Sequence, residues 1–176
     1  MNNLDNHIVL VTGAGSGIGS AIAKRLARDG ARIFLNDIDP EKLNKINTEI
    51  LNLGCAENKV GSMVGDVSSP TDMKLIFQAC LKKFDDLSML VNNAGISYES
   101  AMYFTEVDTN RIDVLIGLNV MALTRMTRIV LDQWEENNEK GDIIKANSVS
   151  ESRLYTYINL PLNDKMHMPP DGNVQL

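Results

Sequence analysis

The sequence has little cysteine and little histidine, and both shortages exclude classes of site. Cys55 and Cys80 form no C-x-x-C motif, so we expect two reduced, packed thiols in a cytoplasmic protein. The two histidines, His7 and His167, lie near opposite ends of the chain. No group of His, Cys and carboxylate residues has metal-ligand spacing, and we therefore expect no metal site.

Long apolar runs and excess positive charge are also missing. No uninterrupted run approaches the ~18 apolar residues of a membrane helix. The polar N-terminus lacks the basic-then-apolar pattern of a signal peptide. A formal net charge of −6 argues against nucleic acid or a membrane as a partner. The 44% of apolar residues among 176 suffices for the core of one domain and excludes disorder of the whole chain.

What the sequence does contain is an alternation of strand-like and helix-like periods. The continuous apolar run Ile8–Val11 is typical of a strand buried on both faces. After a glycine-rich turn, apolar residues recur at helical spacing until Gly30. That helical stripe consists of Ile18, Ile22 and Leu26. A second strand follows at Ile33–Leu35.

The same alternation continues along the chain. Asp39 with Pro40 and Ser69 with Pro70 are typical helix starts, with a capping side chain and proline in the first turn. Further strands are predicted at Val60–Asp66, Leu87–Val91 and about Gly141–Asn147, with helices carrying Leu43, Ile46 and Ile50, then Met73, Phe77, Cys80 and Phe84, then Ile112, Leu115, Leu118, Met126 and Val130 up to about Asn137.

Alternating strands and helices predict an α/β fold with a doubly wound parallel sheet. Five strands joined by crossover helices give the order 3-2-1-4-5, in a three-layer αβα arrangement that is Rossmann-like. Ligands of such sheets bind at the carboxyl ends of the strands, at the switch point beside the first strand.

The segment Thr12–Gly19 lies between the first strand and the first helix and reads TGAGSGIG. Gly13 permits a tight turn, Gly17 lets the backbone approach a pyrophosphate, and Gly19 lets helix and strand pack closely. The free N–H groups at the start of the helix favour phosphate. We therefore predict a dinucleotide site here.

An acidic residue, Asp37, ends the second strand. Its carboxylate can accept hydrogen bonds from the ribose hydroxyls of adenosine and would repel a 2′-phosphate. Since no Arg or Lys follows immediately, we predict NAD rather than NADP as the cofactor. Asp66 and Val67 follow the third strand, close to where an adenine would lie, although Asp66 is also typical of a plain turn.

These motifs, together with Asn92-Asn93-Ala94-Gly95, resemble the short-chain dehydrogenase/reductase family from about His7 to Ser148. The resemblance implies that Asn93, Ala94 and Gly95 steady the sheet and line the nicotinamide ribose. The residues that we assign to cofactor binding are Thr12, Gly13, Ser16, Gly17, Ile18, Gly19, Asp37, Ile38, Asp66, Val67, Asn93, Ala94 and Gly95.

The resemblance also implies catalytic roles for two residues. Ser148, with Ser150 as a nearby alternative, takes the place of the family's serine that hydrogen-bonds the substrate oxygen. Asn119 takes the place of an asparagine that holds a water in a proton relay, and the alternative is an asparagine that only satisfies nearby backbone.

The family's tyrosine and lysine pair, Tyr-x-x-x-Lys, is not found. The four tyrosines, Tyr98, Tyr103, Tyr155 and Tyr157, are followed four residues later by Met102, Val107, Asn159 and Pro161. An ammonium one helical turn away is what lowers a tyrosine pKa enough for base catalysis. The sequence therefore supports cofactor binding, and we expect this form of the protein to lack the family's catalytic activity.

We interpret residues 1–150 as an incomplete NAD-binding domain and 151–176 as an irregular, partly disordered tail. Without the family's later strands, the fifth strand would form the edge of the sheet. Three functions remain open: an NAD-dependent oxidoreductase acting on a small alcohol or ketone, an inactive NAD-binding protein, and a truncated gene product. A homo-oligomer weakened by the missing C-terminal helix is also expected.

Overall fold

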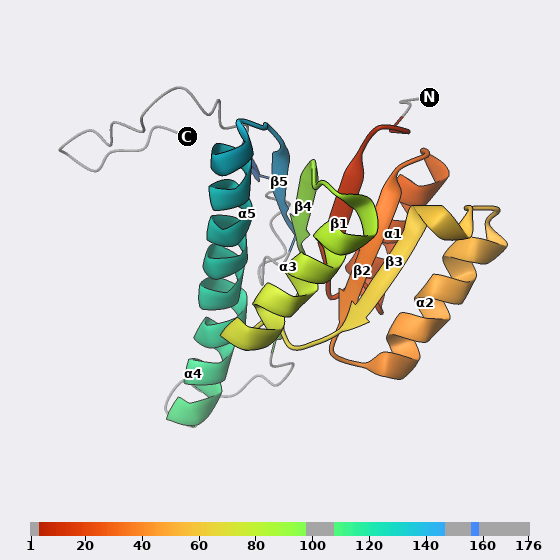
Figure 1. Ribbon diagram of the computed structural model, residues 1–176. Coiled ribbons are helices and arrows are strands. Elements are labelled where there is room, and N and C mark those ends of the chain that lie inside the picture. The colour runs from red at the N-terminus through yellow and green to blue at the C-terminus, as the bar shows by residue number, and fades with distance from the viewer. Residues whose placement is uncertain (1–3, 98–107, 147–155, 159–176) are drawn as a thin grey trace.

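The computed structural model describes residues 4–97, 108–146 and 156–158 (Figure 1). Six strands form one sheet in the order β3-β2-β1-β4-β5-β6. The first five pair in parallel and confirm the predicted order. Their bounds are β1 Ile8–Thr12, β2 Arg32–Asp37, β3 Val60–Val64, β4 Met89–Asn92 and β5 Asp142–Lys145, with β6 at Thr156–Ile158.

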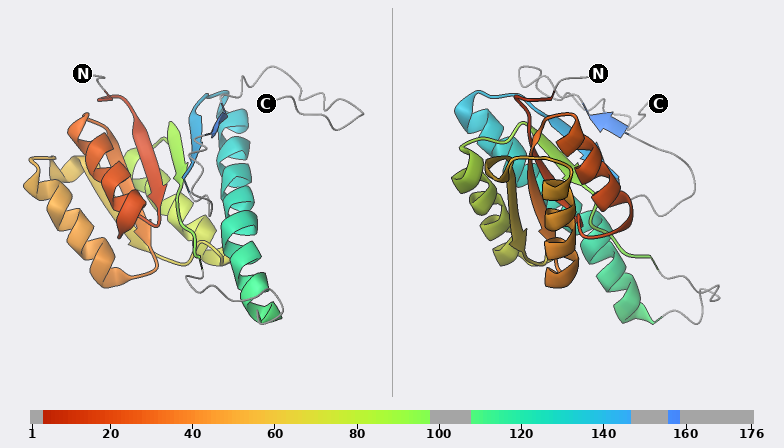
Figure 2. Two further views of the ribbon diagram at one scale, coloured as in Figure 1. Left: turned by 180° about the vertical axis from the view of Figure 1, so that it is seen from behind. Right: turned by 90° about the vertical axis from the view of Figure 1, so that its right-hand side faces the viewer.

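Helices cover both faces of this sheet. In Figures 1 and 2, α1 and α2 lie on one face, and α3 and α5 lie on the other. The helical segments are α1 Gly17–Arg28, α2 Pro40–Asn52, η1 Glu57–Lys59, α3 Pro70–Phe84, α4 Thr109–Ile116, the π-helical η3 Gly117–Ala122 and α5 Leu123–Asn137. The three-layer αβα arrangement follows from this.

Strand β1 shows why both faces need a cover. Ile8 and Leu10 pack with α3 and α5, whereas Val9 and Val11 pack with α1 and α2. All four are at most 1% exposed, so the continuous apolar run of the sequence reflects burial on two sides. The switch point beside β1 is thereby held between two packed cores.

Both predicted helix starts are confirmed by hydrogen bonds. Asp39 Oδ1 accepts from the N–H of Glu41 at 3.0 Å and of Lys42 at 3.1 Å. Ser69 Oγ accepts from the N–H of Asp72 at 3.3 Å. In each case proline is at the first helical position, where the missing N–H costs nothing.

Two details of the fold differ from the sequence prediction. Three residues in 151–176 form β6, antiparallel to β5, so that segment is not irregular throughout and β5 is not the edge of the sheet. A strand of three residues is too short to show the alternation of apolar and polar residues by which a strand is recognised in a sequence. The stripe residue Ile18 is 62% exposed, because the buried face of α1 lies one position along, at Gly19, Ala23 and Ala27.

In the described part of the chain, Thr109–Asn137 forms 29 continuous helical residues, long and apolar enough by composition to cross a membrane. Only 22% of its apolar window is buried inside the protein. At its C-terminal end, Trp134 is buried and its indole N–H donates to the Leu87 carbonyl. Length and composition alone are weak evidence for a span, so the prediction of no membrane partner stays a prediction.

Candidate nucleotide site

A cavity of about 150 Å³ opens at the carboxyl ends of β1, β2, β3 and β4. It is lined by seven of the predicted cofactor residues and by four others. The seven are Gly13, Asp37, Ile38, Asp66, Val67, Ala94 and Gly95, and the four are Asn36, Gly65, Ile96 and Leu118. Drug-sized ligands occupy pockets of about 300 Å³ or more, so this cavity suits one end of a larger ligand.

Glycines shape the turn that leads from β1 into α1. Gly13 has φ +61°, and a Cβ there would lie 2.8 Å from Ala94 Cα. A Cβ at Gly19 would meet the Gly13 carbonyl oxygen and Asn93 Nδ2. The turn, the first helical residues and the segment after β4 therefore touch backbone to backbone, which larger residues would prevent.

Thr12 ties the same two segments together by its hydroxyl. Thr12 Oγ1 accepts from the N–H of Asn93 and of Ala94, each at 3.1 Å, and donates to the Val91 carbonyl at 3.3 Å. Asn93 Nδ2 donates to the carbonyls of Thr12 at 3.0 Å and Gly13 at 2.9 Å. These contacts fix the loop after β4 beside the glycine turn.

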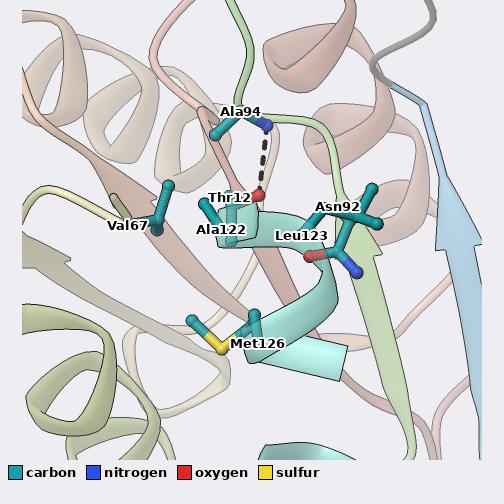
Figure 3. Close-up of a pocket in the computed structure, with 7 residues that line it drawn as sticks. All are labelled: Thr12, Val67, Asn92, Ala94, Ala122, Leu123 and Met126. Carbon is teal, nitrogen blue, oxygen red and sulfur yellow. Dashed lines mark hydrogen bonds between the residues drawn. The ribbon is translucent and has the colours of Figure 1, made fainter. Parts of the chain in front are cut away.

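Figure 3 shows Thr12 and Ala94 at a second, very small cavity of about 10 Å³. Val67, Asn92, Ala122, Leu123 and Met126 complete its lining. Its volume is at the lower limit for one water molecule. This second cavity is therefore too small for a ligand, whereas the larger cavity has room for part of one.

The N-terminus of α1 faces the site without a side-chain cap. Ser16 at the N-cap position makes no capping hydrogen bond, and Ser16, Gly17 and Ile18 are exposed. Gly17 has φ +52°, a conformation that side chains disfavour. Exposed N–H groups at the positive end of a helix are suited to a phosphate group.

The Asp37 carboxylate lies at the other side of this turn. Its Oδ2 accepts from the Gly15 N–H at 2.8 Å, and its Oδ1 accepts from the Asp39 N–H at 3.0 Å. Asp37 is 9% exposed and lines the cavity. A carboxylate has about four acceptor positions, so the two backbone bonds orient it and leave capacity for hydroxyl groups of a ligand.

Neighbouring polar residues hold the rim by backbone contacts. Asn36 Nδ2 donates to the carbonyls of Met63 and Gly65, which holds the chain after β3 against β2. Asp66 Oδ1 accepts from the Ser68 N–H at 2.8 Å. Asp66 is thus both a turn residue and a residue of the cavity wall. Strand β3 ends at Val64, two residues earlier than predicted.

Asn119, predicted as catalytic, is 6% exposed in η3. Its Oδ1 accepts from the Ile96 N–H at 2.9 Å, and its Nδ2 donates to the Ile96 carbonyl at 2.8 Å. This pair of bonds is what the alternative interpretation, an asparagine satisfying backbone, expects. It places Ile96 and Leu118 in the cavity wall. Ser148 lies outside the described residues.

Sequence reasoning missed Asn36, Gly65, Ile96 and Leu118 as lining residues. Three of them adjoin predicted residues: Asn36 precedes Asp37, Gly65 precedes Asp66, and Ile96 follows Gly95. Adjacency at a strand end was therefore the available signal. Leu118 had no local signal, since it reaches the cavity through a contact between distant segments.

The residues present fit a nicotinamide dinucleotide. The glycine turn excludes side chains where a pyrophosphate would lie, α1 offers its N-terminus, and Asp37 is oriented for ribose hydroxyls. Among the described residues no group of three His, Cys, Asp or Glu could hold a metal ion. The geometry thus favours a nucleotide over a metal centre.

Comparison with known proteins agrees with this geometry. The chain is 38% identical over 143 residues to the very-long-chain 3-oxoacyl-CoA reductase of Anas platyrhynchos, covering 80% of this chain and 45% of that protein. It is 33% identical over 141 residues to the inactive hydroxysteroid dehydrogenase-like protein 1 of Homo sapiens, covering 80% of this chain and 42% of that protein.

Among solved structures, the 3-ketoacyl-(acyl-carrier-protein) reductase from Brucella melitensis complexed with NADH superposes with a TM-score of 0.73 at 30% identity. The match covers 81% of this chain and 57% of that one. The chain thus spans about half the length of the proteins it matches. The family model of the short chain dehydrogenases matches residues 7–159, and the chain belongs to that family.

Proposed function

We propose that the chain is the cofactor-binding part of an NAD(H)-dependent oxidoreductase that acts on a carbonyl or secondary alcohol. The observation that carries this proposal is the joined arrangement of the glycine turn, Asp37 and the Thr12–Asn93 contacts around one cavity. The NADH complex of the Brucella reductase supports the same class of cofactor.

Each part of the site has a stated task in binding. The turn 13–19 lets a pyrophosphate approach the backbone, and the N-terminus of α1 stabilises its charge. Asp37 accepts from the adenosine ribose, while Ile38 and Val67 give the adenine apolar contacts. Ala94 and Gly95 line the side toward the nicotinamide ribose. A bound nicotinamide supplies the hydride chemistry, and the protein supplies orientation.

Asp37 also underlies the preference for NAD over NADP. It is a buried carboxylate whose oxygens are both held by backbone N–H groups, so it cannot turn away from the ribose without losing them. A 2′-phosphate at this place would meet a fixed negative charge. NAD, without that phosphate, makes the favourable contact instead.

A second function, nucleotide binding without turnover, is favoured by one sequence observation. None of the four tyrosines is followed by lysine four residues later, and that lysine is what makes a tyrosine an effective base. The human relative, named as inactive, supports this candidate. A panel of alcohols and ketones followed by NADH absorbance separates the two functions, because steady turnover appears only under the first.

Calorimetric titration of NADH into the chain tests binding itself. We expect saturable binding to the parent chain and at least about tenfold weaker binding to Asp37→Ala, the scale of lost hydrogen bonds to a charged group. The same substitution should weaken NADPH binding less than NADH binding. Asp113→Ala on the exposed side of α4 is the matched control and should bind like the parent. Absence of NADH binding to the folded parent chain would contradict the proposal.

A further inference from the structure

Lys42, near the start of α2, lies beside the glycine turn. The same point of the turn is close to Asp37, the carboxylate that we propose binds the ribose. A Cβ placed on Gly15 would lie 2.7 Å from Asp37 Oδ2 and 2.8 Å from Lys42 Cβ. Asp37 and the stem of Lys42 therefore flank the same point of the glycine turn. A side chain at position 15 would separate them, and glycine keeps them together.

The ammonium of this lysine is held by Asp39. Lys42 Nζ lies 3.2 Å from Asp39 Oδ2, while Asp39 Oδ1 caps α2 through the N–H groups of Glu41 and Lys42. Those bonds, led by the one from the Lys42 N–H, lower the pKa of the Asp39 carboxyl. Asp39 therefore stays ionised and pairs with the lysine at neutral pH.

Without its pairing to Asp39, the Lys42 ammonium would be free to approach a phosphate group on a bound nucleotide. Its flexible four-carbon stem begins beside Gly15, to which Asp37 Oδ2 also lies close, and a lysine binds phosphate as a mobile point charge. A phosphate on the 2′-oxygen of a ribose bound to Asp37 would lie on this side of the turn. The N-terminus of α2 adds a positive dipole end there.

We propose that Asp39 is a positioning residue for cofactor choice, because its pairing with Lys42 withholds from a 2′-phosphate the ammonium that would otherwise offset the repulsion by Asp37. This inference rests on the proposed function, since it presumes a nucleotide in the cavity. Cofactor preference is thereby set by a carboxylate pair, Asp37 in the cavity and Asp39 on the helix cap.

Asp39→Asn separates the two roles of Asp39. Asparagine caps helices about as well as aspartate, so α2 keeps its start while the charge that holds Lys42 is removed. The partner variants are Lys42→Met, the double variant, and Lys45→Met as a control on the exposed face of the same helix. Calorimetric Kd values for NADH and NADPH are the readout, with far-UV circular dichroism to check folding.

We expect Asp39→Asn to tighten NADPH binding about fivefold, the scale of one exposed charge contact, and to leave NADH binding unchanged. In the Lys42→Met background the same substitution should change NADPH binding by less than about twofold, because the ammonium is gone. The Lys45→Met control should bind both nucleotides like the parent.

Three results would overturn the inference. An unchanged NADPH affinity in Asp39→Asn shows that the pair does not matter. An equal gain in the Lys42→Met background shows that Asp39 acts by its own charge and not through the lysine. Equal changes for NADH and NADPH show an effect on the helix start only. If the parent chain binds NADH and one of these results appears, this inference fails alone; if it binds no NADH, the proposed function fails with it.

Discussion

Residues 8–97 and the helical segment formed by α4 and η3 contribute to the site in different ways. In residues 8–97, polar groups at the cavity are fixed by bonds between distant segments, as Thr12 and Asn93 illustrate. In α4 and η3, Asn119 makes one such link to Ile96, but α4 has no buried residue and Val114, Ile116, Val120 and Met121 are at least 41% exposed. Residues 8–97 thus form most of the cavity wall, whereas α4 and η3 contact the site through Asn119 and Leu118.

This difference indicates which function the described residues can support. Cofactor binding needs the turn, the acidic strand end and the loop after β4, and all three are held by partly buried hydrogen bonds and close backbone contacts. The resemblance to the family leads us to expect the catalytic residues at Asn119 and at Ser148, which lies outside the described residues. Binding is therefore expected to be robust, and turnover is the property most open to experiment.

The largest effect should come from Gly19→Val, which we expect to lower the free energy of unfolding by disturbing the contacts between the glycine turn and the loop after β4. Its Cβ would meet the Gly13 carbonyl and Asn93 Nδ2, and such overpacking against backbone is expected to cost about 3 kcal/mol or more. Urea unfolding followed by circular dichroism measures the loss. Gly117→Ala in η3, where no atom lies within 4 Å of the added Cβ, is the control. A similar loss in that variant would show that Gly19→Val does not act through the close contacts around Gly19.

Met121 of η3 and Met126 of α5 compare an exposed with a buried side chain in the continuous helix Thr109–Asn137. Met126 is 1% exposed, whereas Met121 is 41% exposed. Met126→Ala should lower the free energy of unfolding by about 3 kcal/mol. Met121→Ala should change it by less than about 0.5 kcal/mol. Equal losses in denaturant unfolding would show that the outer side of η3 is buried in solution.

Thr12→Val tests the link between the glycine turn and the loop after β4. The substitution keeps the shape of the side chain but removes the acceptor of the Asn93 and Ala94 N–H groups. Leaving these two partly buried donors unpaired should cost about 2 kcal/mol and weaken NADH binding. Thr124→Val, at an exposed threonine that donates to the Val120 carbonyl, should cost less. Calorimetry and thermal unfolding of both variants show whether the loss is specific to the contacts of Thr12 or follows from replacing any threonine by valine.

The smallest effect concerns the two thiols. Burial raises the pKa of Cys80 to about 12, and burial also raises the pKa of Cys55. At about pH 8 a disulfide reagent should therefore modify Cys55 first and Cys80 only on unfolding. Because the unfolded thiol ionises near 9.0 and the folded one near 12, the Cys80 contribution to stability falls as pH rises between these values. Rapid labelling of Cys80 in the folded protein would contradict this prediction, because it would show that the core beneath α3 opens readily.

The sequence predicted those features that local chemistry determines. The run Ile8–Val11 revealed a buried strand, and Asp39 and Ser69 revealed helix starts. The five parallel strands followed because alternating elements allow few topologies. The positions of Asp37 and of the glycine turn at one cavity followed from the rule for strand ends.

Features that depend on contacts between distant segments were not predictable in this way. The pairing of Asn119 with Ile96 joins residues 23 positions apart. The π-helical turn Gly117–Ala122 shifts the face of a helix that the period alone treats as continuous. Ile18 fits an apolar stripe but is exposed, because the small residues Gly19, Ala23 and Ala27 form the buried face of α1.

Amide hydrogen exchange with and without NADH tests whether residues 8–97 supply most of the nucleotide site, with Leu118 of η3 completing the cavity wall. We predict slower exchange on NADH binding in residues 13–19, 65–67 and 93–96, which surround the cavity, and no change in α4. Unchanged exchange in the three cavity segments, or protection concentrated in α4, would contradict the account.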